Sequence, residues 1–290
     1  MAKLSHNLEF VATWIAVRLA RMLPAAPADA LAVGLGRLAH RLLSSRRRVA
    51  RDNIVRAMGD DLADSQIDEV VRQSFVHAAR SVLELARMNW YVQRIDEVFE
   101  TTDMDKFERA QREGRGGLVV MAHYGGFEVI GAWLANLDVA MNFMTGVQHN
   151  PRVNLFMQQR RAETGAGLLP VDKGVRQVFK VLRGGQFLAL ISDQHAPSGV
   201  IVDFFGRPAA TPKGPAAFSV KCRSPILPLV CKRLRRDRFR VIVGDLIYPP
   251  DSGDSEADIR NLTQQYTRWF EDVIRRDPGQ WLWTHRRWKV

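Results

Sequence analysis

Residues 119–133 read VVMAHYGGFEVIGAW, and this stretch decides the fold. A short apolar run ends at His123, two glycines follow, and a second apolar segment resumes after Glu128. In one continuous helix, His123 and Glu128 would lie about 140° apart around the axis and would not share a site. The spacing instead predicts a strand that ends near Ala122, a turn at the glycines and a helix from about Phe127.

The predicted turn places His123 and Glu128 at the carboxyl end of a strand, where open α/β sheets bind their ligands. Glu128 would fall in the first turn of the following helix, which favours an ionised carboxylate. A carboxylate that holds one imidazole nitrogen leaves the other free as a general base. In the plainer interpretation, His123 is bonded to a backbone carbonyl and Glu128 is exposed. The pair alone does not identify an enzyme, because this spacing is common by chance.

Strand-like and helix-like segments alternate after about residue 98. The strand candidates are continuous apolar runs, which are typical of parallel strands that are covered on both faces. This alternation predicts an α/β fold with a mainly parallel central sheet flanked by helices. The expected strands are 116–123, 139–146, 167–172, 186–193, 224–234 and 239–247, and the expected helices between them are 127–137, 152–163, 174–182 and 211–222.

The first 95 residues read as helical, and residues 1–45 predict two amphipathic helices. The uncharged apolar run at 10–17 is much shorter than the roughly 20 residues that a spanning helix needs. Leucine stripes flanked by arginine, with Trp14 among them, favour helices that lie in a membrane surface. Packing of the same stripes on the rest of the chain explains the pattern equally well.

The charge balance favours an anionic partner. The 290 residues carry 42 Lys and Arg against 31 Asp and Glu, a formal charge of +11. Nucleic acid, anionic lipid and an acidic carrier protein all suit such a balance. Cys222 and Cys231 have no metal-like spacing and suit a reducing compartment. The histidines are too scattered along the chain to predict a metal site.

Four further segments, in order along the chain, accompany the H-x4-[DE] pattern at His123. They are RRRVARDNIVRAMGD from residue 46, RRAETG from 160, ISDQHAPSGVIVDFFGRPAATPKG from 191 and PGQWLWTHRRWK from 278. Together they resemble the motifs of the bacterial lipid A biosynthesis acyltransferases, the late acyltransferases of the lauroyl and myristoyl type. The resemblance runs from about residue 46 to the C-terminus and is far more specific than one short motif.

The resemblance implies a glycerolipid-acyltransferase-like domain over residues 46–290. The amphipathic pattern predicts a membrane-associating region before it, over residues 1–45. The resemblance also implies that a fatty acyl chain passes from a thioester of acyl carrier protein, or less often of coenzyme A, to a hydroxyl of a lipid A precursor. His123 would take the hydroxyl proton as general base, and Glu128 would orient and stabilise the imidazolium. No acyl-enzyme, metal, cofactor or nucleic-acid partner is expected. The expected location is the cytoplasmic face of the bacterial inner membrane, as a peripheral or monotopic protein.

Seven residues are candidates for substrate binding. The resemblance places Arg161 at the family's substrate-contacting arginine, and a guanidinium suits phosphate and carboxylate groups. Asp193 and Gln194 directly follow an apolar strand, at the edge where such sheets bind ligands. The segment 203–214 would wall an acyl channel beside Phe204, and Gly206 would allow close approach of the backbone. Arg207 and Lys213 would contact phosphates. A solvated helix face at Arg161, a capped loop at Asp193 and a surface loop over 203–214 are the plainer interpretations.

Other functions remain open at the level of sequence. The same chemistry suits another glycolipid, such as a phosphatidylinositol mannoside acylated from acyl-coenzyme A. The charge alone also suits a nucleic-acid-binding protein, and the N-terminal helices alone suit a non-catalytic scaffold on a membrane surface. The closing segment 278–289 sets tryptophans beside arginines, which fits a membrane interface or a plug packed on the domain.

Overall fold

The computed structural model describes residue 18 and residues 21–148, 150–171 and 174–289. Within them lies a seven-stranded sheet of order β1-β9-β8-β2-β5-β3-β4. All neighbours in this sheet pair in parallel except β8 and β9. The strands are β1 (Phe99–Thr101), β2 (Gly117–Gly125), β3 (Met141–Thr145), β4 (Gly167–Pro170), β5 (Phe187–Ile191), β8 (Ile226–Arg235) and β9 (Arg238–Val243), and an antiparallel hairpin of β6 (Val200–Phe204) and β7 (Arg207–Thr211) stands apart.

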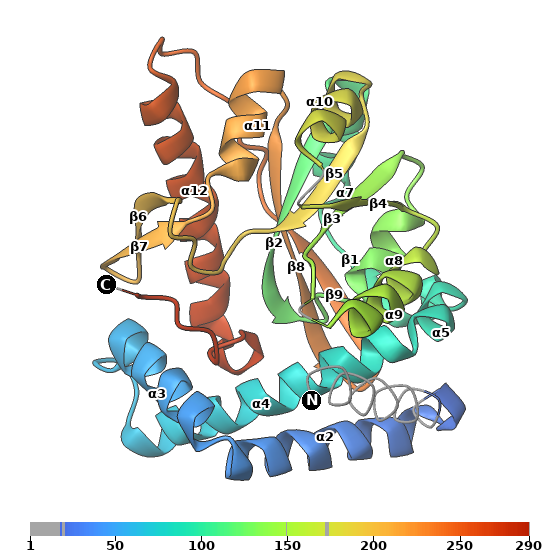
Figure 1. Ribbon diagram of the computed structural model, residues 1–290, viewed down its shortest axis with the longest axis vertical. Helices are drawn as coiled ribbons and strands as arrows, with labels where there is room; N and C mark the ends of the chain where they lie inside the picture. Colours follow the sequence, from blue (N-terminus) through green and yellow to red (C-terminus); the bar gives the residue numbers. More distant parts are fainter. Residues whose placement is uncertain (1–17, 19–20, 149, 172–173, 290) are drawn as a thin grey trace.

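Helices cover both faces of the sheet (Figure 1). One face packs against α4, α11 and α12, and the other against α5, α7 and α8. The helices are α2 (Ala25–Leu42), α3 (Ser44–Met58), α4 (Asp64–Ala86), α5 (Met88–Val92), α6 (Ile95–Val98), α7 (Met104–Arg112), α8 (Ile130–Ala135), α9 (Pro151–Ala162), α10 (Val175–Arg183), α11 (Gly214–Cys222) and α12 (Ser255–Arg276), with a short 3-10 turn at Pro278–Gln280. The predicted α/β class and mainly parallel sheet are therefore confirmed.

The central strand β2 shows why its sequence is apolar without interruption. Leu118 and Val120 face the core beneath α12, whereas Val119 and Met121 face the core beneath α8. All four side chains are buried because helices cover both faces. His123 continues the second set, since side chains alternate along a strand.

Residues 119–133 fold differently from the prediction in two respects. Strand β2 continues past Ala122 to Gly125, and helix α8 begins only at Ile130. Gly125 adopts φ +58°, and a Cβ there would lie 2.0 Å from the Cys231 carbonyl oxygen. The turn therefore needs glycine at 125, but Glu128 lies in the turn and not in the first turn of a helix.

Helices α2, α3 and α4 lie below the sheet in Figure 1, with α4 between α2 and the remainder of the fold. Of the two expected N-terminal helices, the second corresponds to α2, and the first lies outside the described residues apart from its last few positions. Among the described residues, no helix is long and apolar enough to cross a membrane. The division at residue 45 remains a prediction.

Candidate active site

His123 is held by Asp193, which follows the adjacent strand β5. Its ring Nδ1 lies 2.7 Å from Asp193 Oδ1. The backbone N–H of His123 donates to the other carboxylate oxygen, Oδ2, also at 2.7 Å. Parallel pairing of β2 with β5 brings the two residues together, because it sets their carboxyl ends at the same edge of the sheet. Asp193 thus fixes both the ring and the backbone of His123.

A third residue, Trp281, completes this arrangement from the closing segment. Its indole N–H donates to Asp193 Oδ2 at 2.7 Å. The Asp193 side chain is only 3 % exposed. Burial alone would raise the pKa of Asp193, but His123 and the Trp281 donor outweigh it and lower that pKa. Asp193 is therefore the ionised partner of the histidine.

The electrostatics suit a base at His123. Burial alone lowers the pKa of the imidazole, but the Asp193 carboxylate outweighs this and raises the pKa above its ordinary value. The bond to Asp193 places the proton of the neutral ring on Nδ1. Nε2, which makes no bond to any described residue, is then left as the acceptor. The ring lines a cavity, into which a substrate hydroxyl can approach.

In the structure Glu128 does not orient the His123 ring, and its catalytic role remains a prediction. It makes no hydrogen bond to His123; its carboxylate accepts two bonds from Arg161 of α9, from Nε at 3.1 Å and from Nη2 at 2.7 Å. The late start of α8 leaves Glu128 in a turn from which it reaches α9. Glu128 still contributes to the raised pKa of His123, after the contribution of Asp193.

The cavity beside His123 has a volume of about 360 Å³. Its polar lining comprises His123, Glu128, Thr145, Gln148, Arg161, Thr164 and Gln194. Its apolar lining comprises Met88, Met121, Phe127, Ile130, Gly131, Phe143, Met144, Gly146, Val171, Ala189, Leu190 and Ile191. The predicted residues Arg161 and Gln194 thus share one cavity with His123 and Glu128, and Asp193 lies directly behind it.

The register of the sheet shows which lining residues lie near the strand ends and which lie further along the strands. Ile191 pairs with Met121 near the strand ends, and Ala189 lies one pleat further in, beside Phe143. Gly131 of α8 faces this inner layer, since a Cβ there would lie 3.7 Å from the Phe143 ring. Buried Phe187 follows one pleat deeper and stacks on Phe107. The lining of the cavity around Ala189 and Phe143 is therefore mainly apolar.

Four predicted substrate contacts lie outside this cavity. Phe204 is buried in an aromatic cluster with Phe205, Trp281 and Trp288, so it cannot wall the channel beside His123. Gly206 and Arg207 form the exposed tip of the β6–β7 hairpin, where the Arg207 guanidinium donates to the Arg56 carbonyl. Lys213 precedes α11. The segment forms a hairpin because its alternating residues pair across two short strands.

The comparisons with known proteins identify the family of the chain. The family described as "Bacterial lipid A biosynthesis acyltransferase" matches residues 2–290. The chain belongs to this family of acyltransferases. It is therefore an O-acyltransferase, and the family and its relatives support acyl transfer to a glycolipid.

Relatives of two kinds share this family likeness. A phosphatidylinositol mannoside acyltransferase of Mycolicibacterium smegmatis is 27 % identical over 289 residues, covering 97 % of this chain and 91 % of the relative. A lipid A biosynthesis palmitoleoyltransferase of Escherichia coli K12 is 22 % identical over 268 residues, covering 90 % and 84 %. A lipid A biosynthesis lauroyltransferase of the same organism is 23 % identical over 265 residues, also covering 90 % and 84 %.

The described part of the chain shows no metal-binding site. No group of three or more His, Cys, Asp or Glu side chains there is arranged to hold a metal ion. Cys231 is buried, and burial raises the pKa of its thiol well above the usual range, so it is a packing residue and a poor nucleophile. The expected absence of a cofactor remains a prediction.

Proposed function

We propose that this acyltransferase uses His123 as the general base of a direct transfer from a thioester to a lipid hydroxyl. Nε2 takes the proton of the hydroxyl as its oxygen attacks the thioester carbonyl carbon. The tetrahedral intermediate then collapses, the carbon–sulfur bond breaks, and the imidazolium returns the proton to the leaving thiolate. The products are the lipid ester and the free thiol, and no acyl-enzyme forms.

The His123–Asp193–Trp281 arrangement carries this proposal. In a serine hydrolase the buried aspartate orients the histidine and stabilises the imidazolium. Here Asp193 occupies that position, and the substrate hydroxyl takes the place of the serine. Glu128 contributes by holding Arg161 at the polar end of the cavity, where the guanidinium suits a phosphate or the developing oxyanion.

The transferred acyl chain suits the inner part of the cavity. Apolar side chains surround that part, among them Phe143 and Ala189, which pair across β3 and β5. Burial of each methylene contributes roughly 0.8 kcal/mol. A chain bound there would set its carbonyl carbon beside His123 and leave the thioester sulfur toward the opening.

We favour an acyl carrier protein thioester as donor and a lipid A precursor as acceptor. The formal charge of +11 suits both an acidic carrier protein and an anionic glycolipid. A second candidate, acylation of a phosphatidylinositol mannoside from acyl-coenzyme A, draws support from the 27 % identity to the mycobacterial relative.

We propose that the protein lies on the cytoplasmic face of the bacterial inner membrane. This proposal rests on helix α2. Its small residues Ala28, Ala32 and Gly36 are buried, and a Cβ at Gly36 would lie 2.6 Å from the Val76 Cα of α4. Its leucines face outward instead, at positions 31, 35, 38 and 42. An exposed stripe more apolar than the packed one suits insertion between lipid headgroups.

One assay tests the proposal. Acyl carrier protein and coenzyme A thioesters are each paired with a lipid A precursor and with a phosphatidylinositol mannoside. His123→Ala is expected to lower turnover by about 10²–10⁴. Full turnover by folded His123→Ala would refute the mechanism. The preferred donor and acceptor decide between the two candidates.

A further inference from the structure

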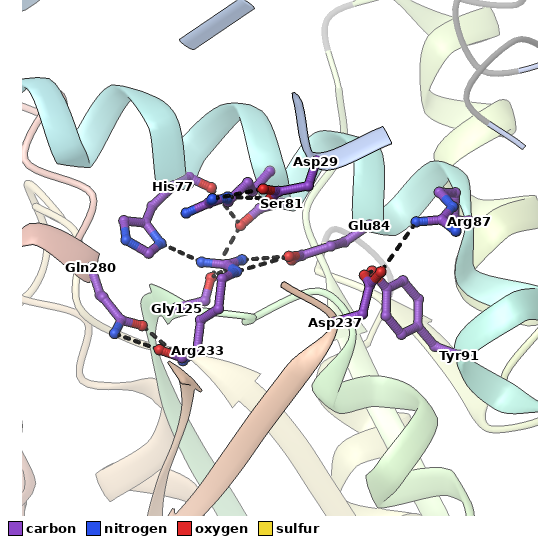
Figure 2. A network of polar contacts seen from close by, with 11 residues as sticks. Asp29, His77, Ser81, Glu84, Arg87, Tyr91, Gly125, Arg233, Asp237 and Gln280 are labelled. Atoms are coloured by element: carbon purple, nitrogen blue, oxygen red, sulfur yellow. Dashed lines mark hydrogen bonds and ion pairs between the residues drawn. The ribbon is translucent and has the colours of Figure 1, made fainter. Parts of the chain in front are cut away.

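A buried polar cluster joins helix α4 to the turn after His123 (Figure 2). His77, Ser81 and Glu84 lie on one face of α4, because they are spaced four and three residues apart. Arg233 of β8 reaches them from the sheet with a side chain that is only 2 % exposed. Its Nε and Nη2 donate to Glu84 Oε1 at 3.0 and 2.5 Å, and its Nη1 contacts His77 Nδ1.

The cluster is balanced in formal charge. Arg233 pairs with Glu84, and two pairs flank it: Arg80 with Asp29, and Arg87 with Asp237. Burial and the neighbouring Arg233 lower the pKa of His77 to about 2, so His77 is neutral and its Nδ1 accepts a hydrogen bond from the Arg233 guanidinium. Burying a guanidinium this deeply has a high desolvation cost, which is offset only when all of its hydrogen-bond partners are in place.

The cluster also holds the carbonyl of Gly125. Arg233 Nη2 and Ser81 Oγ both donate to that oxygen at 3.2 Å. The Arg233 backbone is itself fixed by Gln280, whose amide accepts from its N–H at 2.8 Å and donates to its carbonyl at 2.9 Å. Gly125 lies two residues after His123 on the same strand.

We propose that Arg233 is a positioning residue for His123, acting through the Gly125 carbonyl. It ties the end of β2 to α4 and so fixes the backbone from which the imidazole projects. The inference rests on the proposed role of His123 as the base. Only arginine suits the position, since one planar group must reach Glu84, the His77 ring and the Gly125 carbonyl together. A lysine ammonium keeps the charge but presents its donors from a single atom.

Arg233→Lys tests the inference, with Arg87→Lys as the matched control. Both arginines are buried, both pair with an acid in the same cluster, and Arg87 makes no contact with Gly125. A displacement of about 1 Å at a catalytic group can cost up to 10²-fold. We therefore expect Arg233→Lys to lower kcat about 10- to 100-fold with KM nearly unchanged, and Arg87→Lys to leave kcat within about twofold.

A second measurement does not depend on turnover. Histidine-labelled protein is titrated by nitrogen NMR, with the His123 signals assigned from their loss in His123→Gln. In Arg233→Lys the pKa of His123 is expected to fall from its raised value, because the contact with Asp193 loosens. In Arg87→Lys it is expected to stay in place. Equal loss of unfolding temperature in both variants, with no change in kcat or in the His123 pKa, would make Arg233 merely structural and overturn the inference.

Ser81→Ala keeps the inference falsifiable if Arg233→Lys does not fold. It removes one of the two donors to Gly125 with little change in volume, and we expect kcat to fall about two- to tenfold. An unchanged kcat and His123 pKa in Ser81→Ala would then count against positioning through Gly125. Absence of acyl transfer by the wild type with every donor would refute the proposed function, while the NMR titration would still decide whether Arg233 positions His123.

Discussion

The Trp281 indole donates to Asp193 at 2.7 Å, although the two residues are 88 positions apart in the chain. The same segment pairs with the strand that carries the base, since Tyr124 and Trp281 form a β-bridge and the Leu282 N–H donates to the His123 carbonyl at 3.1 Å. Trp281 and Trp283 are both buried. The closing segment is therefore a structural part of the site, and its tryptophans do not face a membrane.

Asp193→Asn tests which acid orients the base. An asparagine keeps the shape of the side chain but removes the charge that fixes the tautomer of His123. We expect kcat to fall by about 10²–10⁴. The check is kcat of the purified variant, with its unfolding temperature as a control for folding. A decrease of less than tenfold would show that Asp193 does not act on the base.

The pH dependence should report the raised pKa of His123. A general base must be neutral, so kcat/KM should fall as the pH drops through a pKa above the ordinary value of 6.5. The same raised pKa means that the contribution of His123 to stability is full below 6.5 and is lost as the pH rises through the folded value.

Variants at the two acids separate their influence on this profile. Without the Asp193 charge, burial has the main effect on the pKa of His123 and lowers it. The acidic limb of the kcat/KM profile should therefore move to lower pH in Asp193→Asn. Glu128→Gln should move it less, because Glu128 raises the pKa of His123 after Asp193 does. A larger shift in Glu128→Gln than in Asp193→Asn would show that Glu128, and not Asp193, is the main partner of the base.

The identity of that partner shows where prediction from sequence ends. The strand, the glycine turn and the candidate residues His123, Asp193 and Arg161 could be predicted from apolar runs and motif order. The sequence could not decide between two acids near one histidine. The choice depends on where β2 ends and α8 begins, and three residues of difference turned Glu128 toward α9. The β6–β7 hairpin could not be predicted, because each of its strands has only five residues and glycine or proline flanks them at 199, 206 and 212.

Arg161→Lys should impair the polar end of the cavity. Arg161 holds Glu128 with two parallel bonds, a geometry that lysine cannot reproduce. We expect kcat/KM to fall about 10- to 100-fold. Arg160→Lys is the matched control, since Arg160 pairs with Glu163 at 2.5 Å and does not line the cavity. Equal losses in the two variants would indicate a general effect of replacing an arginine on α9.

Gly131→Val should shorten the preferred acyl chain. Its Cβ would make ordinary contacts with Phe143 and Thr164 at 3.7 Å, and the two added methyl groups would occupy the inner cavity. Because a methylene in an apolar pocket changes the rate by about tenfold or more, the ratio of long-chain to short-chain kcat/KM should fall at least about tenfold. Gly131→Ala, which adds only the Cβ, is the control and should shift the ratio much less. An unchanged ratio in Gly131→Val would place the acyl chain elsewhere.

Replacing leucines of the outer α2 stripe should release the protein from lipid. Leu35 and Leu42 are 44 % and 70 % exposed, so Leu35→Glu with Leu42→Glu should leave the unfolding temperature nearly unchanged. Each leucine that the lipid buries contributes roughly 1.5–3 kcal/mol to membrane binding, and the added glutamates are repelled by an anionic surface. We expect flotation with anionic vesicles to weaken at least about tenfold. Ile201→Glu is the control, because Ile201 is 57 % exposed on the separate β6–β7 hairpin. Wild-type flotation by the double variant would contradict membrane docking through α2.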